Sequence, residues 1–343
     1  MKKPAIYQYL SIDFYSATPR YIQLANCIVK AITAGKVRQN DMLPSINELS
    51  AELEISRDTV EKCFKYLKKK GIVGSVAGKG YFIQSTEVDE QLKIFMLFNK
   101  LSLHKKIIYD AFAEAIGSNA LIDLYIYHND FDLFTRLIQN RKADYTHYVV
   151  IPYYTKGEEN TAEVLQSLPA DKLIVLDKLV PGLSGAYGAV YEKFDADLYN
   201  ALETALPQLQ KYHTLHLLFP EDTYHPQEIL RGFKLFCRHY TFTYQVITHI
   251  SELQIAPGHV YINLMEDDLV VLIEKIMAQQ LEVGRQVGVI SYNETPLKKI
   301  ILNGITTIST DFAQMGHTAA QLIKTSSADR IANPFRLTLR ASL

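Results

Sequence analysis

The sequence has no tryptophan, only three cysteines among 343 residues, and no run of 18 apolar residues. Cys27, Cys63 and Cys237 lack the CxxC spacing of redox or zinc motifs, so we expect them to pack as small apolar side chains. The missing apolar run argues against a membrane-spanning helix, and residues 1–5 do not lead into the apolar stretch of a signal peptide. These absences predict a cytoplasmic protein.

Motifs of common enzyme classes are also missing. The sequence contains no GxxxxGK[ST] phosphate loop and no GxSxG nucleophile turn. His213 and His216 resemble part of a metal site, but no third or fourth ligand has a useful spacing. The acidic run 266–268 precedes a predicted helix, where negative charge suits the helix dipole. We therefore expect no metal, no cofactor and no enzyme activity.

Overall charge is balanced at −1, but its distribution along the chain is not. Residues 1–85 hold 13 lysines and arginines against seven acidic residues, and the rest of the chain holds 23 against 30. This asymmetry indicates a basic module that binds a polyanion and an acidic module with another task.

The basic module has the pattern of three helices. Apolar residues recur at three- and four-residue steps over residues 20–34, and Gly35 can end that helix. Ser45 and Glu48 have the spacing of a capping box at the start of a second helix. A third helix is predicted from the Ser56 cap to Gly71. The last two helices, about ten residues apart, indicate a helix-turn-helix.

Two short strands follow, at residues 72–76 and 81–83, with Gly78, Lys79 and Gly80 between them. We interpret this hairpin as a wing. The polar residues after it predict a linker at 86–92, which separates a winged helix-turn-helix domain at 1–85 from a second domain at 93–343.

The first turn of the third helix is the candidate for DNA reading. A recognition helix inserts its N-terminal residues into the major groove. Arg57 suits a guanine edge or a phosphate, and the hydroxyls of Ser56 and Thr59 suit the backbone. Lysines add positive charge along the helix and its exit; a solvated lysine face is the alternative, but the caps, turn and wing together favour DNA. These lysines are Lys62, Lys65, Lys68, Lys69 and Lys70.

The segments PRYIQLANCIVKAI, LPSINELS, ISRDTVEKCFKYLKKKGI and GKGYFI resemble the winged-helix domain of the GntR family across residues 18–84. This resemblance implies a transcription regulator with DNA contacts from the second helix cap, the recognition helix and the wing. Two positions depart from the family: Asn47 stands where an arginine is common, and Glu61 replaces another basic residue. The implied DNA-binding residues are Ser45, Asn47, Ser56, Arg57, Thr59, Lys62, Gly78, Lys79 and Gly80.

After the linker, apolar strand-like runs alternate with amphipathic helical segments. Such β-α repeats predict parallel sheets covered on both faces, and about 250 residues of them commonly form two lobes. Ligands in these folds bind beyond the carboxyl ends of the strands. The predicted strands are 94–98, 122–127, 148–151, 173–176, 215–219, 244–247, 260–262 and 287–290.

The segments KLIVLDKL, ILRGFKLF and GVISYNETPLKKIILNGITTISTDFAQMG resemble the periplasmic-binding-protein-like sensor of LacI-type repressors. The last segment continues through residues 305–308 to a helix that begins at Asp311. Joined to a GntR domain, this sensor is similar to arabinose-type repressors. The resemblance implies an α/β domain of two lobes that binds a small sugar.

A sugar site needs polar groups for hydroxyls and an aromatic face for the ring. The resemblance places candidates after the strands, including Asp177 and, for stacking, Tyr153, Tyr154 and Phe219. Ile229 stands where relatives have a sugar-clamping arginine, and Asn293 where they have aspartate. The implied effector-binding residues are Asn99, His104, Lys105, Tyr153, Lys178, Arg231, Glu266, Asp267, Asn293 and Glu294.

We therefore expect a homodimer that binds operator DNA and a monosaccharide or its derivative, of the pentose or deoxyhexose class, to control carbohydrate utilisation genes. Sugar binding would close the lobes and alter operator affinity. A sugar-metabolising enzyme fused to a DNA-binding domain is the alternative. A regulator should leave the sugar chemically unchanged.

Overall fold

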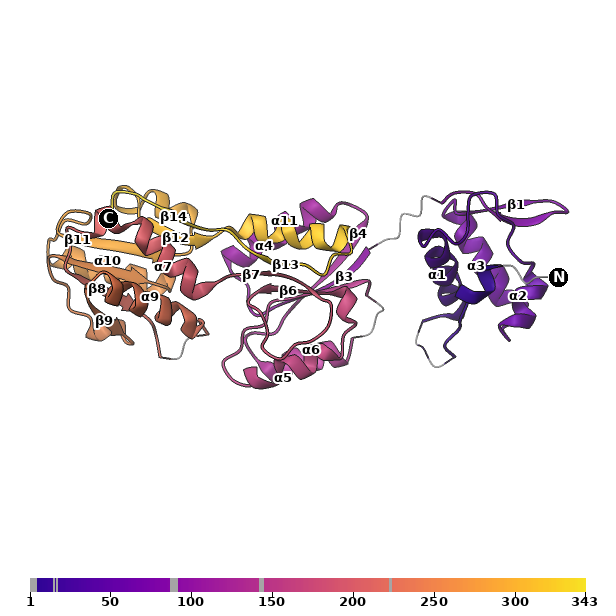
Figure 1. The fold of residues 1–343 in the computed structure, drawn as a ribbon, viewed down its shortest axis with the longest axis horizontal. Helices are drawn as coiled ribbons and strands as arrows, with labels where there is room; N and C mark the ends of the chain where they lie inside the picture. The colour runs from indigo at the N-terminus through magenta and orange to yellow at the C-terminus, as the bar shows by residue number, and fades with distance from the viewer. Residues whose placement is uncertain (1–4, 15, 17, 87–91, 142–144, 222–223) are drawn as a thin grey trace. The chain divides into compact units, whose positions relative to one another are not determined.

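A computed structural model of the chain describes residues 5–14, 16, 18–86, 92–141, 145–221 and 224–343. The chain divides into two compact units, residues 1–91 and 92–343, which we call the N-terminal and C-terminal units (Figure 1). Most of the predicted linker at 86–92 falls on residues 87–91, outside the described residues.

The N-terminal unit has the predicted order of three helices and a hairpin. Ser45 and Glu48 form the capping box at the start of α2, and the Ser56 side chain accepts a hydrogen bond from the Thr59 amide at the start of α3. Both helices therefore begin where the sequence predicts. The elements are α1 (Arg20–Thr33), α2 (Ile46–Glu52), α3 (Arg57–Lys69), β1 (Val73–Val76) and β2 (Gly80–Ile83), preceded by a 3₁₀ turn at Ala5–Tyr9.

One apolar core holds these elements together. Leu24 and Ile28 of α1 and Phe64 and Leu67 of α3 are fully buried in it, and Ile83 joins them from β2. The hydrophilic faces of α1 and α3 point outward, as the three- and four-residue spacing requires. Strands β1 and β2 pair antiparallel, with Val76 opposite Gly80.

The C-terminal unit contains two six-stranded sheets in its described residues. Lobe 1 has strand order β13-β7-β6-β5-β3-β4 and all of its pairs are parallel. Lobe 2 has the order β14-β12-β11-β10-β8-β9, in which only the described pair β12–β14 is antiparallel. The lobe 1 strands are β3 (Leu92–Phe98), β4 (Ala120–Ile126), β5 (His147–Val150), β6 (Leu173–Asp177), β7 (Gly188–Tyr191) and β13 (Arg330–Ala332). The lobe 2 strands are β8 (Thr214–Leu218), β9 (Thr243–Ile247), β10 (His259–Asn263), β11 (Val287–Tyr292), β12 (Thr306–Thr310) and β14 (Phe335–Thr338).

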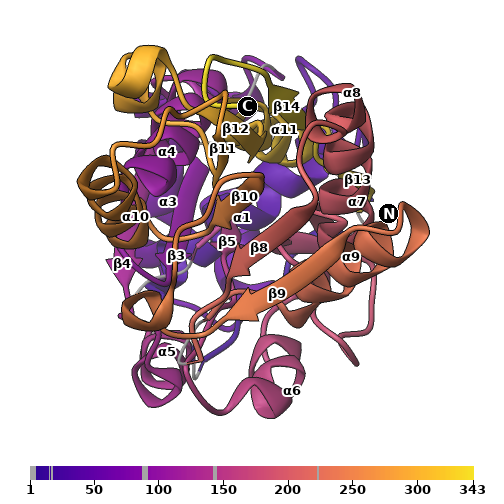
Figure 2. The same cartoon turned by 90° about the vertical axis from the view of Figure 1, so that its left-hand side faces the viewer.

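Helices cover both faces of each sheet. In lobe 1, α4 and α11 lie on one face and α5 and α6 on the other (Figure 1). Strand β3 accordingly sends Ile94, Met96 and Phe98 into one core and Phe95 and Leu97 into the other. Figure 2 shows the strands of lobe 2 between α10 on one side and α7 and α9 on the other. The helices are α4 (Leu103–Ile116), α5 (Phe131–Gln139), α6 (Thr161–Gln166), α7 (Phe194–Thr204), α8 (Leu206–Leu209), α9 (Gln227–His239), α10 (Glu266–Ala278) and α11 (Phe312–Lys324).

This architecture confirms the predicted fold class, and each predicted strand is present within about two residues of its predicted bounds. Strands β7, β12, β13 and β14 were not among the predicted strands. Strand β7 is apolar but only four residues long, and four of the five β12 side chains carry hydroxyl groups. Strands β13 and β14 have three and four residues, and β13 is exposed along its length. Short or polar segments of this kind lack the longer apolar run that marks a buried strand.

The chain passes between the lobes three times: after β7, after β12 and after β13. Asn333, which is 5% exposed, joins the three crossings. Its backbone amide donates to the Tyr191 carbonyl oxygen at 2.7 Å. Its side-chain amide donates to Thr310 Oγ1 at 2.7 Å and to the Asp311 carbonyl oxygen at 2.9 Å. The two lobes therefore share one compact, hydrogen-bonded junction.

Close packing of α4 against α11 fixes one wall of the space between the lobes. A Cβ atom on Gly316 would lie 2.4 Å from the Ile108 carbonyl oxygen and 2.9 Å from the Phe112 amide nitrogen. These are backbone atoms of α4 and cannot move aside without moving the helix. Only glycine allows this approach.

Gly316→Ala should lower the stability of the C-terminal unit by about 1–3 kcal/mol, because the added methyl group overpacks the helix pair. Thermal unfolding of the full chain measures the effect. Gln321→Ala, at an exposed position of the same helix, is the matched control and should unfold like the parent protein. Equal melting temperatures for the two variants would contradict the packing argument.

Candidate functional site

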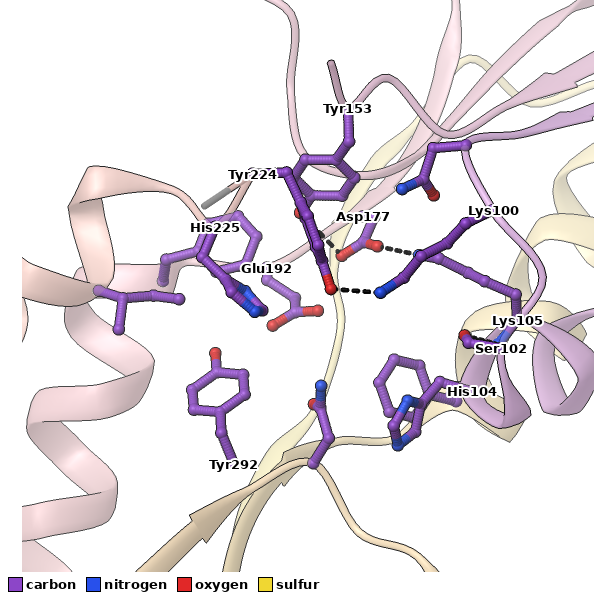
Figure 3. A pocket seen from close by; sticks show the side chains of 15 residues that line it. Lys100, Ser102, His104, Lys105, Tyr153, Asp177, Glu192, Tyr224, His225 and Tyr292 are labelled. Atoms are coloured by element: carbon purple, nitrogen blue, oxygen red, sulfur yellow. Dashed lines mark hydrogen bonds and ion pairs between the residues drawn. The ribbon is translucent and has the colours of Figure 1, made fainter. Parts of the chain in front are cut away.

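A small cavity, which we call the inner chamber, lies between the lobes at the carboxyl ends of their strands (Figure 3). The centre of a water molecule can move through about 60 Å³ of it. Lobe 1 contributes Tyr153 after β5 and Asp177 at the end of β6, and lobe 2 contributes Tyr292 at the end of β11. The remaining lining residues are Asn99, Lys100, Ser102, His104, Lys105, Glu192, Phe194, Tyr224, His225, Ile229, Asn293 and Phe312.

Asp177 is the centre of a buried polar network. Its carboxylate accepts from Lys105 Nζ at 2.5 Å and from the Tyr153 hydroxyl at 3.3 Å (Figure 3). Burial alone would raise the pKa of Asp177, but the Lys105 ammonium and hydrogen bonds from Glu192, Lys105 and Tyr153 outweigh it and lower that pKa. Asp177 is therefore the ionised partner of a buried ion pair.

Glu192 holds a proton in this network. Burial, followed by the nearby negative charge of Asp177, raises the pKa of Glu192 well above its ordinary value. Two adjacent buried carboxyl groups cannot both ionise cheaply, so the Glu192 carboxyl donates to the Asp177 carboxylate. The group of Lys105, Asp177 and Glu192 thus carries no net charge.

Several buried polar atoms of the inner chamber have no hydrogen-bond partner among the described residues. They are Asn99 Oδ1, His104 Nε2 and Glu192 Oε2. Burial lowers the pKa of His104 to about 4, so its imidazole is neutral near pH 7. An unsatisfied buried polar atom costs about 1–3 kcal/mol. The chamber is thus prepared for a ligand with hydrogen-bonding groups.

Backbone strain also marks this chamber. Asp177 has φ of 78° and Asn293 has φ of 65°, both in the left-handed region. Such conformations cost energy and gather at functional sites, where they aim side chains.

A second cavity, the outer chamber, adjoins the inner one and gives the centre of a water molecule about 520 Å³. Its walls include Leu103 at the start of α4 and Leu297 in the 3₁₀ turn Pro296–Lys299. Glu266 and Asp267, in the first turn of α10, also line it. A further cavity on another side of the junction is lined by Lys178 and Tyr154.

The structure brings most of the effector residues predicted from the sequence to these cavities. Asn99, His104, Lys105, Tyr153 and Asn293 line the inner chamber. The outer chamber adds Glu266 and Asp267, while Lys178 lies at the further cavity. Ile229, where the family resemblance implies an arginine, is fully buried in the wall of the inner chamber.

Two predicted effector residues lie elsewhere. Arg231 projects from α9 to a separate surface groove with Leu235, and it pairs with Glu228 at 3.0 Å. It is two residues beyond Ile229 on the helix, so it faces another direction. Glu294 does not line the chambers; it makes an ion pair with Arg340 at 2.9 Å. The structure therefore does not bring Arg231 and Glu294 to the chambers that the other predicted effector residues line.

Of the three residues predicted to stack on a sugar ring, one lies at the inner chamber and two lie in apolar cores. Tyr153 faces the inner chamber. Tyr154 packs with Tyr127 and Phe134 in the core of lobe 1, and Phe219 is buried in the apolar core. The sequence missed Glu192, Tyr224, His225 and Phe312, which follow or precede short strands. Glu192 comes directly after β7, and a carboxylate at the end of an apolar tetrapeptide was its one available signal.

The predicted DNA-binding residues lie on the exterior of the N-terminal unit. Arg57 is exposed at the first position of α3, and no hydrogen bond or ion pair of its side chain occurs among the described residues. Ser45 and Ser56 serve as helix caps, and Ser56 Oγ lies 2.8 Å from Thr59 Oγ1. Asn47 is exposed on α2.

The lysines of α3 are partly compensated by acidic neighbours. Lys62 pairs with Asp58 and Lys65 with Glu61, each at 2.7 Å, one turn apart on the helix. These exposed pairs are weak and can exchange for phosphate. In the wing, Gly78, Lys79 and Gly80 are exposed at the turn between β1 and β2.

Within the described part of the chain, no helix is long and apolar enough to cross a bilayer. No cluster of three His, Cys, Asp or Glu side chains suited to a metal ion occurs there either. His216 and His259 instead hydrogen-bond to each other at 2.9 Å.

Comparison with known proteins identifies the N-terminal unit. Residues 20–83 match the family of bacterial regulatory proteins called the gntR family. This segment is a GntR-family DNA-binding domain. The chain is similar to the HTH-type transcriptional repressor YtrA of Bacillus subtilis, at 27% identity over 106 residues, which are 31% of this chain and 78% of that protein. It is also similar to the arabinose metabolism transcriptional repressor of Geobacillus stearothermophilus, at 28% identity over 74 residues, 22% of this chain and 20% of that one.

Solved structures match the C-terminal unit of this regulator. The trehalose repressor of Escherichia coli aligns with a TM-score of 0.61 at 14% identity, over 73% of this chain and 100% of that one. The lactose repressor bound to the anti-inducer ONPF aligns with a TM-score of 0.61 at 15% identity, over 73% and 99%. The C-terminal unit therefore has the fold of LacI-type repressors. The GntR-family domain, the repressors among its relatives and the LacI-type fold together indicate a transcription regulator.

Glu192→Gln tests the proton on Glu192. Because folding raises this pKa, the stability it contributes is complete below the unfolded value and is lost as pH rises toward the folded value. Glutamine does not titrate, so the variant should gain stability relative to the parent by about 1.4 kcal/mol per pH unit above about pH 5. Chemical denaturation at several pH values measures this slope. The exposed control Glu163→Gln should show none, and a flat difference for Glu192→Gln would contradict the protonated state.

Proposed function

We propose that this regulator binds operator DNA through its GntR domain and a small sugar of the pentose or deoxyhexose class in the inner chamber. Ligand binding would change operator affinity and so control carbohydrate utilisation genes. A protein that acts on operator DNA works in the cytoplasm, which we include in the proposal.

The unpartnered polar atoms of the inner chamber carry the sugar assignment. Sugar hydroxyls donate and accept, so they can satisfy Asn99 Oδ1 and His104 Nε2 together. The Tyr153 and Tyr224 rings also line the chamber, and their centroids lie 6.0 Å apart.

Contacts from both lobes support the link to a conformational change. Lys100 after β3 in lobe 1 donates to the Tyr224 hydroxyl after β8 in lobe 2 (Figure 3). A ligand that touches both Tyr153 and Tyr292 would stabilise the closed arrangement of the lobes over an open one. A difference in affinity for the two arrangements is what an effector requires.

For DNA binding we propose Arg57, Thr59 and Lys62 of α3 as the principal contacts, with Ser45, Asn47 and Ser56 near the backbone and the wing residues Gly78, Lys79 and Gly80 at the adjacent groove. A homodimer would present two such units to a near-palindromic operator, since two-fold protein symmetry matches two-fold DNA symmetry.

Arg57→Ala should weaken operator binding by about 1–3 kcal/mol if the guanidinium makes a bidentate base contact. A titration at fixed salt, with specific and scrambled DNA, measures this loss. Arg57→Lys keeps the positive charge but loses the paired N–H donors of the guanidinium. This variant should bind scrambled DNA as the parent protein does, but should prefer the operator sequence less. Unchanged operator affinity for Arg57→Ala would show that Arg57 does not contact the operator bases.

A thermal-shift screen of monosaccharides and their phosphates should find a stabilising ligand that is recovered chemically unchanged. With that ligand at saturation, operator affinity should change by about 1–3 kcal/mol. Equal affinity with and without the ligand would refute the coupling. Turnover of the sugar without operator binding would refute the regulator.

A further inference from the structure

The groove that Arg231 faces on the surface of lobe 2 is separate from the chambers between the lobes. Helices α7 and α9, which lie side by side (Figure 2), form its two walls. None of its described lining residues also lines the inner or the outer chamber. The groove gives the centre of a water molecule about 590 Å³, whereas one buried water needs about 10–15 Å³. It therefore has room for several side chains of a bound molecule.

Close contact between the two helices forms the floor of the groove. Gly232 of α9 lies against the start of α7, where a Cβ atom on this glycine would meet the Asp195 carbonyl oxygen at 2.2 Å. The side chains of the walls recur at three- and four-residue steps, as in Asp195 and Tyr199 on α7 and in Leu235 and Arg238 on α9. Such spacing places them on one face of each helix. Two helical walls of this kind can hold a third helix between them.

The groove is rich in positive charge although the chain around it is acidic. Its described lining residues include the cations Arg231, Lys234 and Arg238 and one carboxylate, that of Asp195. The chain after residue 85 instead holds 23 lysines and arginines against 30 acidic residues. Arg231 makes an exposed pair with Glu228, and such pairs are weak. Lys234 and Arg238 make no side-chain hydrogen bond or ion pair among the described residues, so both are available to an anionic partner.

Apolar surface lies among these charges. Leu235 is 60% exposed and directly follows Lys234, while Ala196 and Tyr199 line the same groove from α7. Nucleic acid backbone would offer phosphates to the cations but no apolar group to cover Leu235. A protein segment can offer both carboxylates for the cations and an apolar side chain for the leucine. The chemistry of the groove therefore favours a protein partner.

Charge also argues against a second copy of this chain in the groove. A two-fold contact brings the same residues of both copies together around the symmetry axis. Lys234 and Arg238 of one copy would then approach those of the other, and like charges opposed across an interface cost affinity. The complementary partner is acidic.

We propose that the groove between α7 and α9 binds an acidic amphipathic helix of another protein. Carboxylates of that helix pair with Arg231, Lys234 and Arg238. An apolar side chain between them packs on Leu235 and Tyr199. This inference goes beyond the proposed function and does not depend on the identity of the small-molecule effector.

Fluorescence anisotropy with synthetic peptides tests the proposal on the full chain. The probe is a short labelled helical peptide with glutamates on both sides of a leucine on one face, and its counterpart has glutamine in place of each glutamate. The glutamate peptide should bind at least about tenfold more tightly, because hydrogen bonds between ionised groups are stronger than neutral ones. Added salt should weaken this binding. Equal affinity of the two peptides, or no binding of either, would overturn the proposal.

Charge reversal assigns the peptide to the groove. Lys234→Glu and Arg238→Glu should each weaken binding of the glutamate peptide at least about fivefold, because a like charge then faces the carboxylates. Lys324→Glu is the matched control: it makes the same change in net charge at an exposed position of α11 outside the groove, and it should bind like the parent protein. Equal losses in all three variants would indicate nonspecific charge attraction and contradict the proposed site.

A second pair of variants tests the apolar contact. Leu235→Ser should weaken peptide binding at least about threefold, because less apolar surface is buried. Leu339→Ser should leave binding unchanged, since Leu339 is 43% exposed in the same lobe but does not line the groove. Equal peptide affinities for the two variants would rule out the amphipathic partner.

Two further measurements would reveal other occupants of the groove. Loss of self-association in sedimentation of Leu235→Ser, but not of Leu339→Ser, would assign the groove to a second copy of the chain. Weaker binding of scrambled DNA by Lys234→Glu, but not by Lys324→Glu, would assign it to nucleic acid. Either result would overturn the proposal. Unchanged self-association and DNA binding, together with the expected peptide affinities, would support it.

Discussion

The buried ion pair between Lys105 and Asp177 determines the charge states of the groups around it in the C-terminal unit. It joins the first turn of α4 to the end of β6 where little water can reach, and removal of one partner from such a pair typically costs about 3–5 kcal/mol. It also fixes the state of its neighbours, since the charge of Asp177 keeps a proton on Glu192 at the crossing between the lobes. One buried interaction thus leaves a carboxyl and carboxylate pair that Lys105 neutralises, in a cavity lined by polar atoms that still need partners.

The cavity lies next to the three crossings of the chain between the lobes. Asn333 lies on the third crossing and hydrogen-bonds to the other two. A change in the arrangement of the two lobes would therefore take place mainly at this junction. The cavity lies beside that junction and takes side chains from both lobes. The proposed ligand would therefore contact both lobes next to the junction that connects them.

Sequence reasoning succeeded best where local chemistry decides structure. The caps at Ser45 and Ser56, the glycine turn of the wing and the apolar strand runs each depend on residues close in the chain. Sequence reasoning was less successful in predicting which residues line the cavity. Arg231 and Glu294 have suitable chemistry and suitable positions in the sequence, but one faces outward from α9 and the other is held by Arg340, 46 residues away.

The sequence by itself determined most of the elements and their order, the α/β class and the basic character of the GntR domain, because helix periodicity, caps and apolar strand runs are local properties. Only the tertiary structure decided which side chains share a cavity. Glu192, Tyr224 and Tyr292 come from three strand ends far apart in the chain, and parallel strands in two lobes bring those ends together. The pKa of Glu192 follows from that proximity, since a carboxyl keeps its proton only where another charge and the exclusion of water require it.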